Sequence, residues 1–280
     1  MIDMNALVMP PWIVYPQFAM GNAEWQTGCG EAYMQHFTAY YQSLDRDAQA
    51  EYTRLFPEPV VWRGFLTGDA PCVRYERGML SFPLYREGGK AKYTVGSLCD
   101  RFNAGEQMTF IPFWGHTPDA NGRISKRCLS QWWLDSFTVD GVVYNCMEQY
   151  MMAGKARLFG DEETLALIMA AEKQAEIKAL GRKVRNFDSA AWDEAKHGLI
   201  VSGNYHKFTQ NPPLRNYLLS TGDSVLVEAS PYDGIWGVRL PSDSPDISDP
   251  DKWKGENLLG FALMEVRDEI RRVFAHAAGV

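Results

Sequence analysis

Residues 129–158, LSQWWLDSFTVDGVVYNCMEQYMMAGKARL, carry a hairpin signal that is followed directly by a helix signal. Residues 137–144 form two short β-rich runs around an Asp-Gly pair, which favours a type I′ turn. The residues after the hairpin favour a helix apart from Gly154, and Asn145 is a good N-cap for it. We therefore predict a β-hairpin that leads into a helix.

Two ionisable side chains lie on this predicted helix. Glu148 and Lys155 are seven residues apart, so they lie within about 20° of each other on one face and roughly 10 Å apart along the axis. This distance is too long for a direct ion pair, but it suits two groups that approach one substrate. Two ordinary alternatives stay open: Glu148 could be the back-bonding member of a capping box, and Lys155 could be a solvated surface lysine.

The rest of the chain predicts an α+β fold, mainly helical, with a small sheet. A helical signal covers residues 30–56 and is closed by Pro57 and Pro59. Candidate strands occupy residues 60–62, 73–75, 80–82, 93–95 and 224–229. Helix-compatible runs cover residues 161–171, 174–184, 189–205, 212–219 and 257–274, and residues 241–250 are expected to form a loop.

Composition limits the classes of function. The chain has 280 residues, of which 46% are hydrophobic, so it can bury a sizeable core, to which we assign Trp12, Trp25, Trp62 and Trp253. The five cysteines form no Cys-x-x-Cys pair, which argues against a disulfide framework or a structural zinc site. We expect reduced thiols, and we predict neither a metal nor a cofactor, since no phosphate-binding glycine loop is present.

Charge and hydropathy limit the partners. The net charge of −7 argues against broad electrostatic capture of nucleic acid. A local nucleic-acid contact stays open at a basic cluster, although such a cluster is usually a solvated helix face. The cluster consists of Lys178, Arg182, Lys183 and Arg185. No apolar run is long enough to span a membrane and no signal peptide is visible, so we expect a cytoplasmic protein whose oligomeric state is open.

Ordered sequence blocks resemble the NADAR (YbiA-like) family. The opening blocks are LSQWW at 129–133, FTVDG at 137–141, EQY at 148–150 and KA at 155–156. The later blocks are LGR at 180–182, WD at 192–193, KFTQNP at 207–212, LLSTGD at 218–223, LVEASPYDGIWG at 226–237, NLLG at 257–260 and LMEVR at 263–267. The resemblance covers residues 113–272. It implies a NADAR-like catalytic domain at 109–276, preceded by an N-terminal extension, 1–108, with a helix, a β-rich part and no assigned role.

The resemblance implies hydrolysis of N-glycosidic bonds. Some family members cleave a phosphoribosylamino-pyrimidine intermediate of riboflavin synthesis, and others remove ADP-ribose from the amino group of guanine. Both reactions break the bond between ribose C1′ and an amine, with a small molecule or a nucleic acid as the carrier. We expect ADP-ribosyl guanine as the substrate, with the riboflavin intermediate as the alternative. A module that binds ADP-ribose or a modified base without hydrolysis is an alternative of another class.

Three residues match positions to which the family resemblance assigns a role in the reaction. Glu148 is the expected general acid or base, because a carboxyl in an apolar, tryptophan-lined pocket has a raised pKa. Lys155 is the expected partner, whose neutral amine would capture the ring-opened C1′ imine as a Schiff base. Asp233 would hold a ribose hydroxyl or orient water, although Pro-Tyr-Asp-Gly is also ordinary turn chemistry.

The expected substrate-binding residues combine aromatic faces with close backbone approach. Trp114 and Trp236 each precede a glycine, which lets the backbone approach a ligand. Arg239 stands near a position where some family members carry an acid, so a phosphate contact is one interpretation and a solvated arginine the other. Asn257 either caps the last helix or faces the pocket. The full set is Trp114, Gly115, Ser130, Trp132, Phe137, Tyr150, Trp192, Trp236, Gly237, Arg239 and Asn257.

Overall fold

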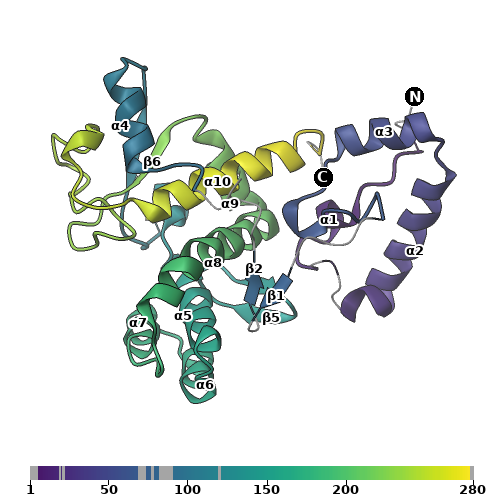
Figure 1. The fold of residues 1–280 in the computed structure, drawn as a ribbon. Helices are drawn as coiled ribbons and strands as arrows, with labels where there is room; N and C mark the ends of the chain where they lie inside the picture. Colours follow the sequence, from purple (N-terminus) through teal and green to yellow (C-terminus); the bar gives the residue numbers. More distant parts are fainter. Residues whose placement is uncertain are drawn as a thin grey trace.

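The structure, a computed structural model, describes residues 6–18, 20, 23–68, 74–76, 79–81, 91–118 and 121–277. The helices are α1 Pro11–Val14, α2 Gly28–Ser43, α3 Arg46–Leu55, α4 Val95–Asn103, α5 Met147–Leu158, α6 Glu162–Ala170, α7 Gln174–Gly181, α8 Ser189–Gln210, α9 Pro212–Ser220 and α10 Leu258–Val273. The strands are β1 Arg74–Glu76, β2 Met79–Ser81, β3 Phe110–Phe113, β4 Phe137–Val139, β5 Val142–Tyr144 and β6 Val225–Glu228. The predicted α+β class is confirmed: helices dominate and pack around short two-stranded sheets (Figure 1).

The predicted hairpin is confirmed. β4 pairs antiparallel with β5, with Phe137 opposite Tyr144. Asp140 and Gly141 have φ angles of 51° and 75°, the left-handed pair that a type I′ turn requires. Gln210 at the end of α8 holds the hairpin, because its amide accepts from Thr138 N at 2.8 Å and donates to Thr138 O at 2.7 Å.

A second sheet joins distant parts of the chain. β3 and β6 are parallel, and their register places Phe110 opposite Val225 and Phe113 opposite Glu228. Residues 225–227 are buried on both faces of the strand. Since the strands are parallel, the segments that follow their carboxyl ends emerge at the same edge of the sheet.

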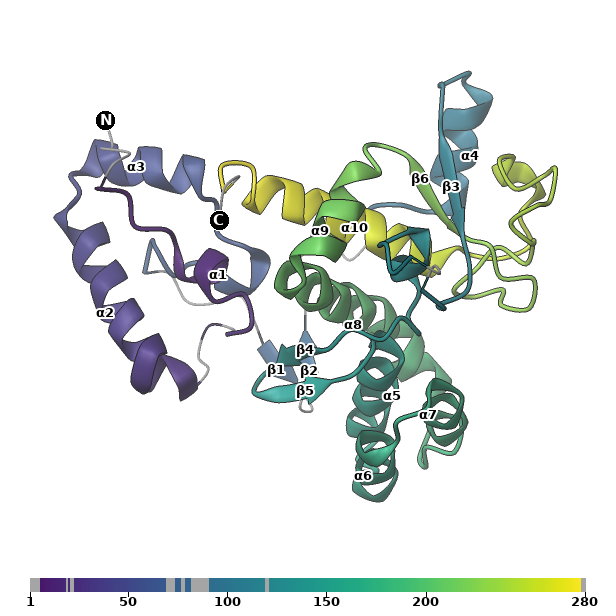
Figure 2. The ribbon, with the colours of Figure 1, turned by 180° about the vertical axis from the view of Figure 1, so that it is seen from behind.

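Helices α5, α8 and α10 carry the main core. The middle of α8 is buried on all sides, and it lies between α5 and α10 (Figures 1 and 2). A separate aromatic core holds the N-terminal helices, with Trp12, Trp25 and Trp62 in edge or tilted ring contacts. Val273 and Ala277 belong to this second core, so α10 and the residues after it connect the two cores. The assignment of these three tryptophans to packing is confirmed.

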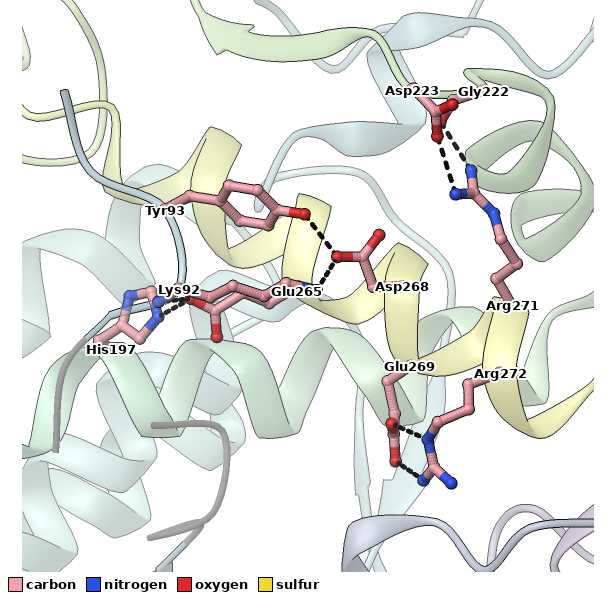
Figure 3. Close-up of polar contacts among 10 residues, drawn as sticks. All are labelled: Lys92, Tyr93, His197, Gly222, Asp223, Glu265, Asp268, Glu269, Arg271 and Arg272. Atoms are coloured by element: carbon pink, nitrogen blue, oxygen red, sulfur yellow. Dashed lines mark hydrogen bonds and ion pairs between the residues drawn. The ribbon is translucent and has the colours of Figure 1, made fainter. Parts of the chain in front are cut away.

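Polar side chains on α10 form hydrogen bonds and ion pairs with several other segments (Figure 3). Glu265 contacts Nε2 of His197 on α8 at 3.1 Å. Asp268 accepts from Tyr93 Oη at 2.6 Å and pairs with Lys92. Glu269 pairs with Arg272 and also accepts from Val60 N at 3.1 Å, which ties the N-terminal part to the helix.

Several local predictions are wrong. The helical signal at 30–56 is broken at Leu44, because Asp45 caps a new helix by accepting from Ala48 N at 2.8 Å. The predicted strand at 60–62 is a short 3-10 helix, η3 Val60–Trp62, that follows Pro59. The predicted strand at 93–95 is the start of α4, where Thr94 and Ser97 form a capping box.

Other boundaries shift by a few residues. The predicted strands at 73–75 and 80–82 correspond to β1 and β2, and Val73 and Phe82 themselves lie outside the described residues. α7 ends at Gly181, before the predicted end, whereas α8 continues to Gln210. Within the described ranges, no helix is both long and apolar enough to cross a membrane. Cys29, Cys99, Cys128 and Cys146 are free thiols.

Candidate active site

The candidate site lies where β3 and β6 end. Ala229 N donates to Phe113 O at 2.9 Å, so the two chains leave the sheet together. Trp114 follows β3 and is 52% exposed, which leaves an aromatic face open to solvent. Gly115 has a φ of 81°, a left-handed conformation that suits glycine in the turn after the tryptophan. Tyr232, in the segment after β6, is also open to solvent.

The Glu148 side chain takes no part in capping α5. The N-cap of α5 is Cys146, not the predicted Asn145, and Cys146 makes no side-chain cap bond. Gln149 makes the back-bond instead, because its Oε1 accepts from Asn145 N at 2.8 Å. The capping-box interpretation of Glu148 is therefore wrong.

The Glu148 carboxyl is a buried acid. The residue is 3% exposed, and Oε1 has no hydrogen-bond partner among the described residues. Burial raises the pKa of Glu148 to about 7, with a further upward effect from Asp233 and downward effects from Lys178 and a hydrogen bond with Trp132. Such a carboxyl can donate or accept a proton near neutral pH.

Glu228, at the end of β6, is a half-buried residue whose carboxyl oxygen Oε2 is buried. Burial raises its pKa to about 8, and the charge of Asp233 raises it further, whereas Lys178 acts in the opposite direction. Its Oε2 has no partner in the described part of the chain. Gly237 packs directly on this residue, since a Cβ there would lie 2.7 Å from Glu228 O. Two carboxyls that share the same charged neighbours indicate a proton-handling site.

Glu228 was not among the site residues predicted from the sequence. The available signal was its position at the end of a buried apolar run inside the shared block 226–237. Lys178 was also missed, because its helix carries a basic cluster that resembles a solvated face. Its Nζ lies 5.8 Å from the ring centroid of Trp132, and its charge acts on both Glu148 and Glu228.

Asp233 has the turn role that the sequence predicted, and its charge also acts on two glutamates. Its Oδ1 accepts from Ile235 N and Trp236 N, both at 2.9 Å, which is the predicted turn chemistry. The charge of the same carboxylate raises the pKa of both Glu148 and Glu228. The turn therefore places a negative charge beside both protonatable groups.

Lys155 lies apart from these acids. Its Nζ donates to Gly181 O at 3.0 Å and lies 4.2 Å from the ring centroid of Phe187 and 5.8 Å from that of Trp192. Burial lowers the pKa of this amine. No hydrogen bond or ion pair joins Lys155 to Glu148 across the described ranges, as expected for two side chains about two turns apart on α5.

Asn257 positions Glu228. The residue is buried with a left-handed φ of 52°, and its side chain does not cap α10. Its Oδ1 accepts from Glu228 N at 3.0 Å and its Nδ2 donates to Leu226 O at 2.9 Å. The capping interpretation is therefore wrong, because both ends of the amide bind the β6 backbone.

The other predicted binding residues lie in three settings. Trp132 contacts the ring of His116 at 5.2 Å between centroids, and Ser130 Oγ accepts from Trp132 N at 3.2 Å. Phe137 and Tyr150 are buried in the core, with ring centroids 5.8 Å apart. Trp236 is half-buried, whereas Arg239 is exposed and packs against Gly234. Within the described residues, no group of His, Cys, Asp and Glu side chains could hold a metal ion.

Comparison with known proteins identifies the family. The NADAR domain model matches residues 112–271. The chain belongs to the NADAR family. The N-glycosidase R617 of Acanthamoeba polyphaga mimivirus is 49% identical over 126 residues, which are 45% of this chain and 74% of the viral protein.

Two further NADAR relatives extend the comparison. The riboflavin biosynthesis protein VVA0006 of Vibrio vulnificus is 31% identical over 175 residues, which are 62% of this chain and 42% of that protein. The NMR structure of the E. coli protein YbiA has 27% sequence identity and a TM-score of 0.47, and the match covers 59% of this chain and 86% of that chain. Relatives named N-glycosidases confirm the predicted family and the predicted class, a hydrolase that acts on N-glycosidic bonds.

Proposed function

We propose that this NADAR protein removes ADP-ribose from the amino group of guanine, in DNA, RNA or a nucleotide. The supporting observation is the pair formed by buried Glu148 and half-buried Glu228, whose carboxyl pKa values are both raised and both affected by Asp233. Cleavage of a ribosylamine needs a proton for the leaving amine and a negative charge near the cationic sugar. The three carboxyl groups suit both needs.

In the proposed reaction, protonated Glu148 gives its proton to the guanine amine as the C1′–N bond breaks. The bonding electron pair goes to nitrogen, and Asp233 stabilises the positive charge that develops on the ribose. A water molecule then adds to C1′ and gives up a proton to a carboxylate of the site. One water is consumed, and free guanine amine and ADP-ribose are the products.

The surroundings suit the two ends of ADP-ribosyl guanine. Open faces at Trp114 and Tyr232 offer stacking surfaces for a base. Lys178, Arg182 and Arg239 are the cations we assign to the diphosphate, because the first two act on Glu148 and Arg239 packs on the turn that carries Asp233.

Product release tests the proposal. A guanine-ADP-ribosylated oligonucleotide is incubated with the native chain, with Glu148→Gln and with Glu172→Gln, and the released ADP-ribose is quantified by mass spectrometry. Glu172 is an exposed glutamate and serves as the matched control. We expect release by the native chain and the control, and a loss of about 100-fold or more in Glu148→Gln, since a positioned acid usually contributes roughly 100- to 10,000-fold.

The phosphoribosylamino-pyrimidine of riboflavin synthesis is the second candidate substrate, which the name of the Vibrio relative favours. It is assayed beside the oligonucleotide with the same three proteins. Release from this substrate alone would overturn the guanine proposal and keep the N-glycosidase class. Release from neither would favour a module that binds ADP-ribose or a modified base without hydrolysis.

A Schiff base on lysine is the second part of the mechanism to test. The amine of Lys155 has a lowered pKa, whereas the charge of Lys178 acts on both Glu148 and Glu228. Borohydride is added during turnover, and peptide mass spectrometry locates the reduced adduct. An adduct on Lys155 supports the prediction from sequence, one on Lys178 moves the nucleophile to α7, and unmodified lysines favour direct attack by water.

A further inference from the structure

A cavity of about 310 Å³ lies at the opposite edge of the β3-β6 sheet from the candidate active site. Thr109, which precedes β3, and Val225, which begins β6, line the cavity, whereas Phe113 and Glu228 end these strands at the active-site edge. A four-residue strand spans roughly 13 Å. The cavity is therefore separate from the three carboxyl groups described above.

Arg267 on α10 lines this cavity with unused hydrogen-bonding capacity. The residue is 2% exposed. Its Nη1 donates to Thr221 Oγ1 at 2.8 Å and to Ser224 O at 2.9 Å. Its Nε is buried and has no partner among the described residues. A buried cationic donor without an acceptor is costly, so an acceptor supplied by a ligand would be stabilising.

Within the described residues, Arg267 has no ion-pair partner, and the charges of Asp268 and Asp223 reach it only from beyond ion-pair distance. Three carboxylates line the cavity: Glu106 pairs with Arg101, Asp223 with Arg271 at 2.9 Å, and Asp268 with Lys92. Figure 3 shows the last two pairs, to which α10 contributes Asp268 and Arg271. No carboxylate of the described chain lies within ion-pair distance of Arg267. The cavity thus carries one unpaired positive charge and favours one negative charge.

The walls and the guanidinium restrict the shape of the ligand. Met108, Val225 and Met264 give the cavity an apolar side. The Nε and Nη2 edge of an arginine is a planar fork that fits the two oxygens of a carboxylate. A phosphate dianion would bring a second charge beside three carboxylates whose cations are already in use. The volume lies at the low end of the range of roughly 300–1,000 Å³ for small-molecule pockets.

We propose that this cavity binds a small monocarboxylate. Its two oxygens accept from Nε and Nη2 of Arg267, and its short aliphatic or aromatic part contacts Met108 and Met264. The proposal is independent of the N-glycosidase reaction, because it places a second ligand at the other end of the sheet.

The test uses the full chain with methyl-labelled methionine. Propionate and benzoate are titrated at constant ionic strength, with sulfate and chloride as the comparison anions, and methyl NMR spectra are recorded. We expect saturable shifts confined to the methyl groups of Met108 and Met264 for the two carboxylates. No saturable shift, or equal shifts with all four anions, would overturn the proposal.

Two variants separate the site from general electrostatics. Arg267→Lys keeps the charge but removes the planar fork, and it should weaken carboxylate binding about tenfold or more. Arg271→Lys is the matched control on the same helix, because Arg271 already pairs with Asp223, and binding should not change. Gln107→Trp fills the cavity from its exposed side and leaves the contacts of Arg267 intact, so it should also block binding. Equal affinity in the native chain and in both Arg267→Lys and Gln107→Trp would contradict the proposal.

Discussion

Glu148 should show opposite effects on stability and on activity. Burial raises its folded-state pKa from 4.5 to about 7, so the native state holds more protons than the unfolded state between these values. Stability from this group is therefore complete below pH 4.5 and is lost as the pH rises through 7. Near pH 4, Glu148→Gln and the native chain should have the same free energy of unfolding. At pH 8, the free energy of unfolding of Glu148→Gln should be about 1–3 kcal/mol higher than that of the native chain.

Denaturant unfolding at the two pH values measures this difference, and Glu172→Gln is the exposed control. The same native carboxyl should lose activity as an acid above pH 7, since only its protonated form donates. A Glu148→Gln chain that is less stable than the native one at pH 8 would show that the carboxylate is compensated in the folded state.

At the scale of the element, Lys207 on α8 holds the loop that carries Trp132. The lysine is fully buried, and its Nζ donates to Cys128 O at 2.7 Å and to Ser130 O at 3.1 Å. This loop also reaches Glu148, because Gln131 O accepts from Glu148 N at 2.9 Å. Lys207 is thus a positioning residue for the site, while burial lowers the pKa of its amine to about 8.

Lys207→Met should leave two carbonyls without a donor and displace the loop. If the N-glycosidase reaction runs through Glu148, kcat should fall about 100-fold, the usual cost of a misplacement near 1 Å. Because the Trp132 hydrogen bond lowers the pKa of Glu148, the fall in activity at high pH should also move to higher pH. Lys196→Met is the control, since Lys196 lies on the same helix and pairs with Asp193 instead. An unchanged pH profile in both variants would rule out the positioning role.

At the scale of the whole molecule, α10 connects two cores that should open separately. Trp62 is 2% exposed within the N-terminal aromatic core, and Trp62→Ala should cost about 3–5 kcal/mol there. Hydrogen exchange should rise in α2, α3 and the last turn of α10, while α5 and α8 keep their protection. Val143→Ala, at an exposed position of β5, is the control. A uniform rise across all helices would show one cooperative unit instead.

Local patterns in the sequence determined the elements. The Asp-Gly pair predicted the hairpin because a type I′ turn matches the twist of the two strands. Three- and four-residue spacings of apolar side chains, together with cap and proline signals, located most helices. Family blocks added Glu148 and Asp233. The same local logic failed at 60–62 and 93–95, where β-branched residues stand beside proline or a helix cap, so turn and capping chemistry overrode strand propensity.

Only the tertiary structure decided how the site is assembled. The parallel pairing of β3 with β6 places Trp114 beside the residues after Glu228, and no local pattern specifies a partner strand far away in the chain. Lys155 has the helical spacing from Glu148 that the sequence indicates. The packing of α7 against α5, however, places Gly181 O where it accepts from the Lys155 amine, and it places Lys178 where its charge acts on Glu148. The raised pKa of each glutamate depends on burial of its carboxyl group. Burial results from tertiary packing and cannot be inferred from the spacing of residues in the sequence.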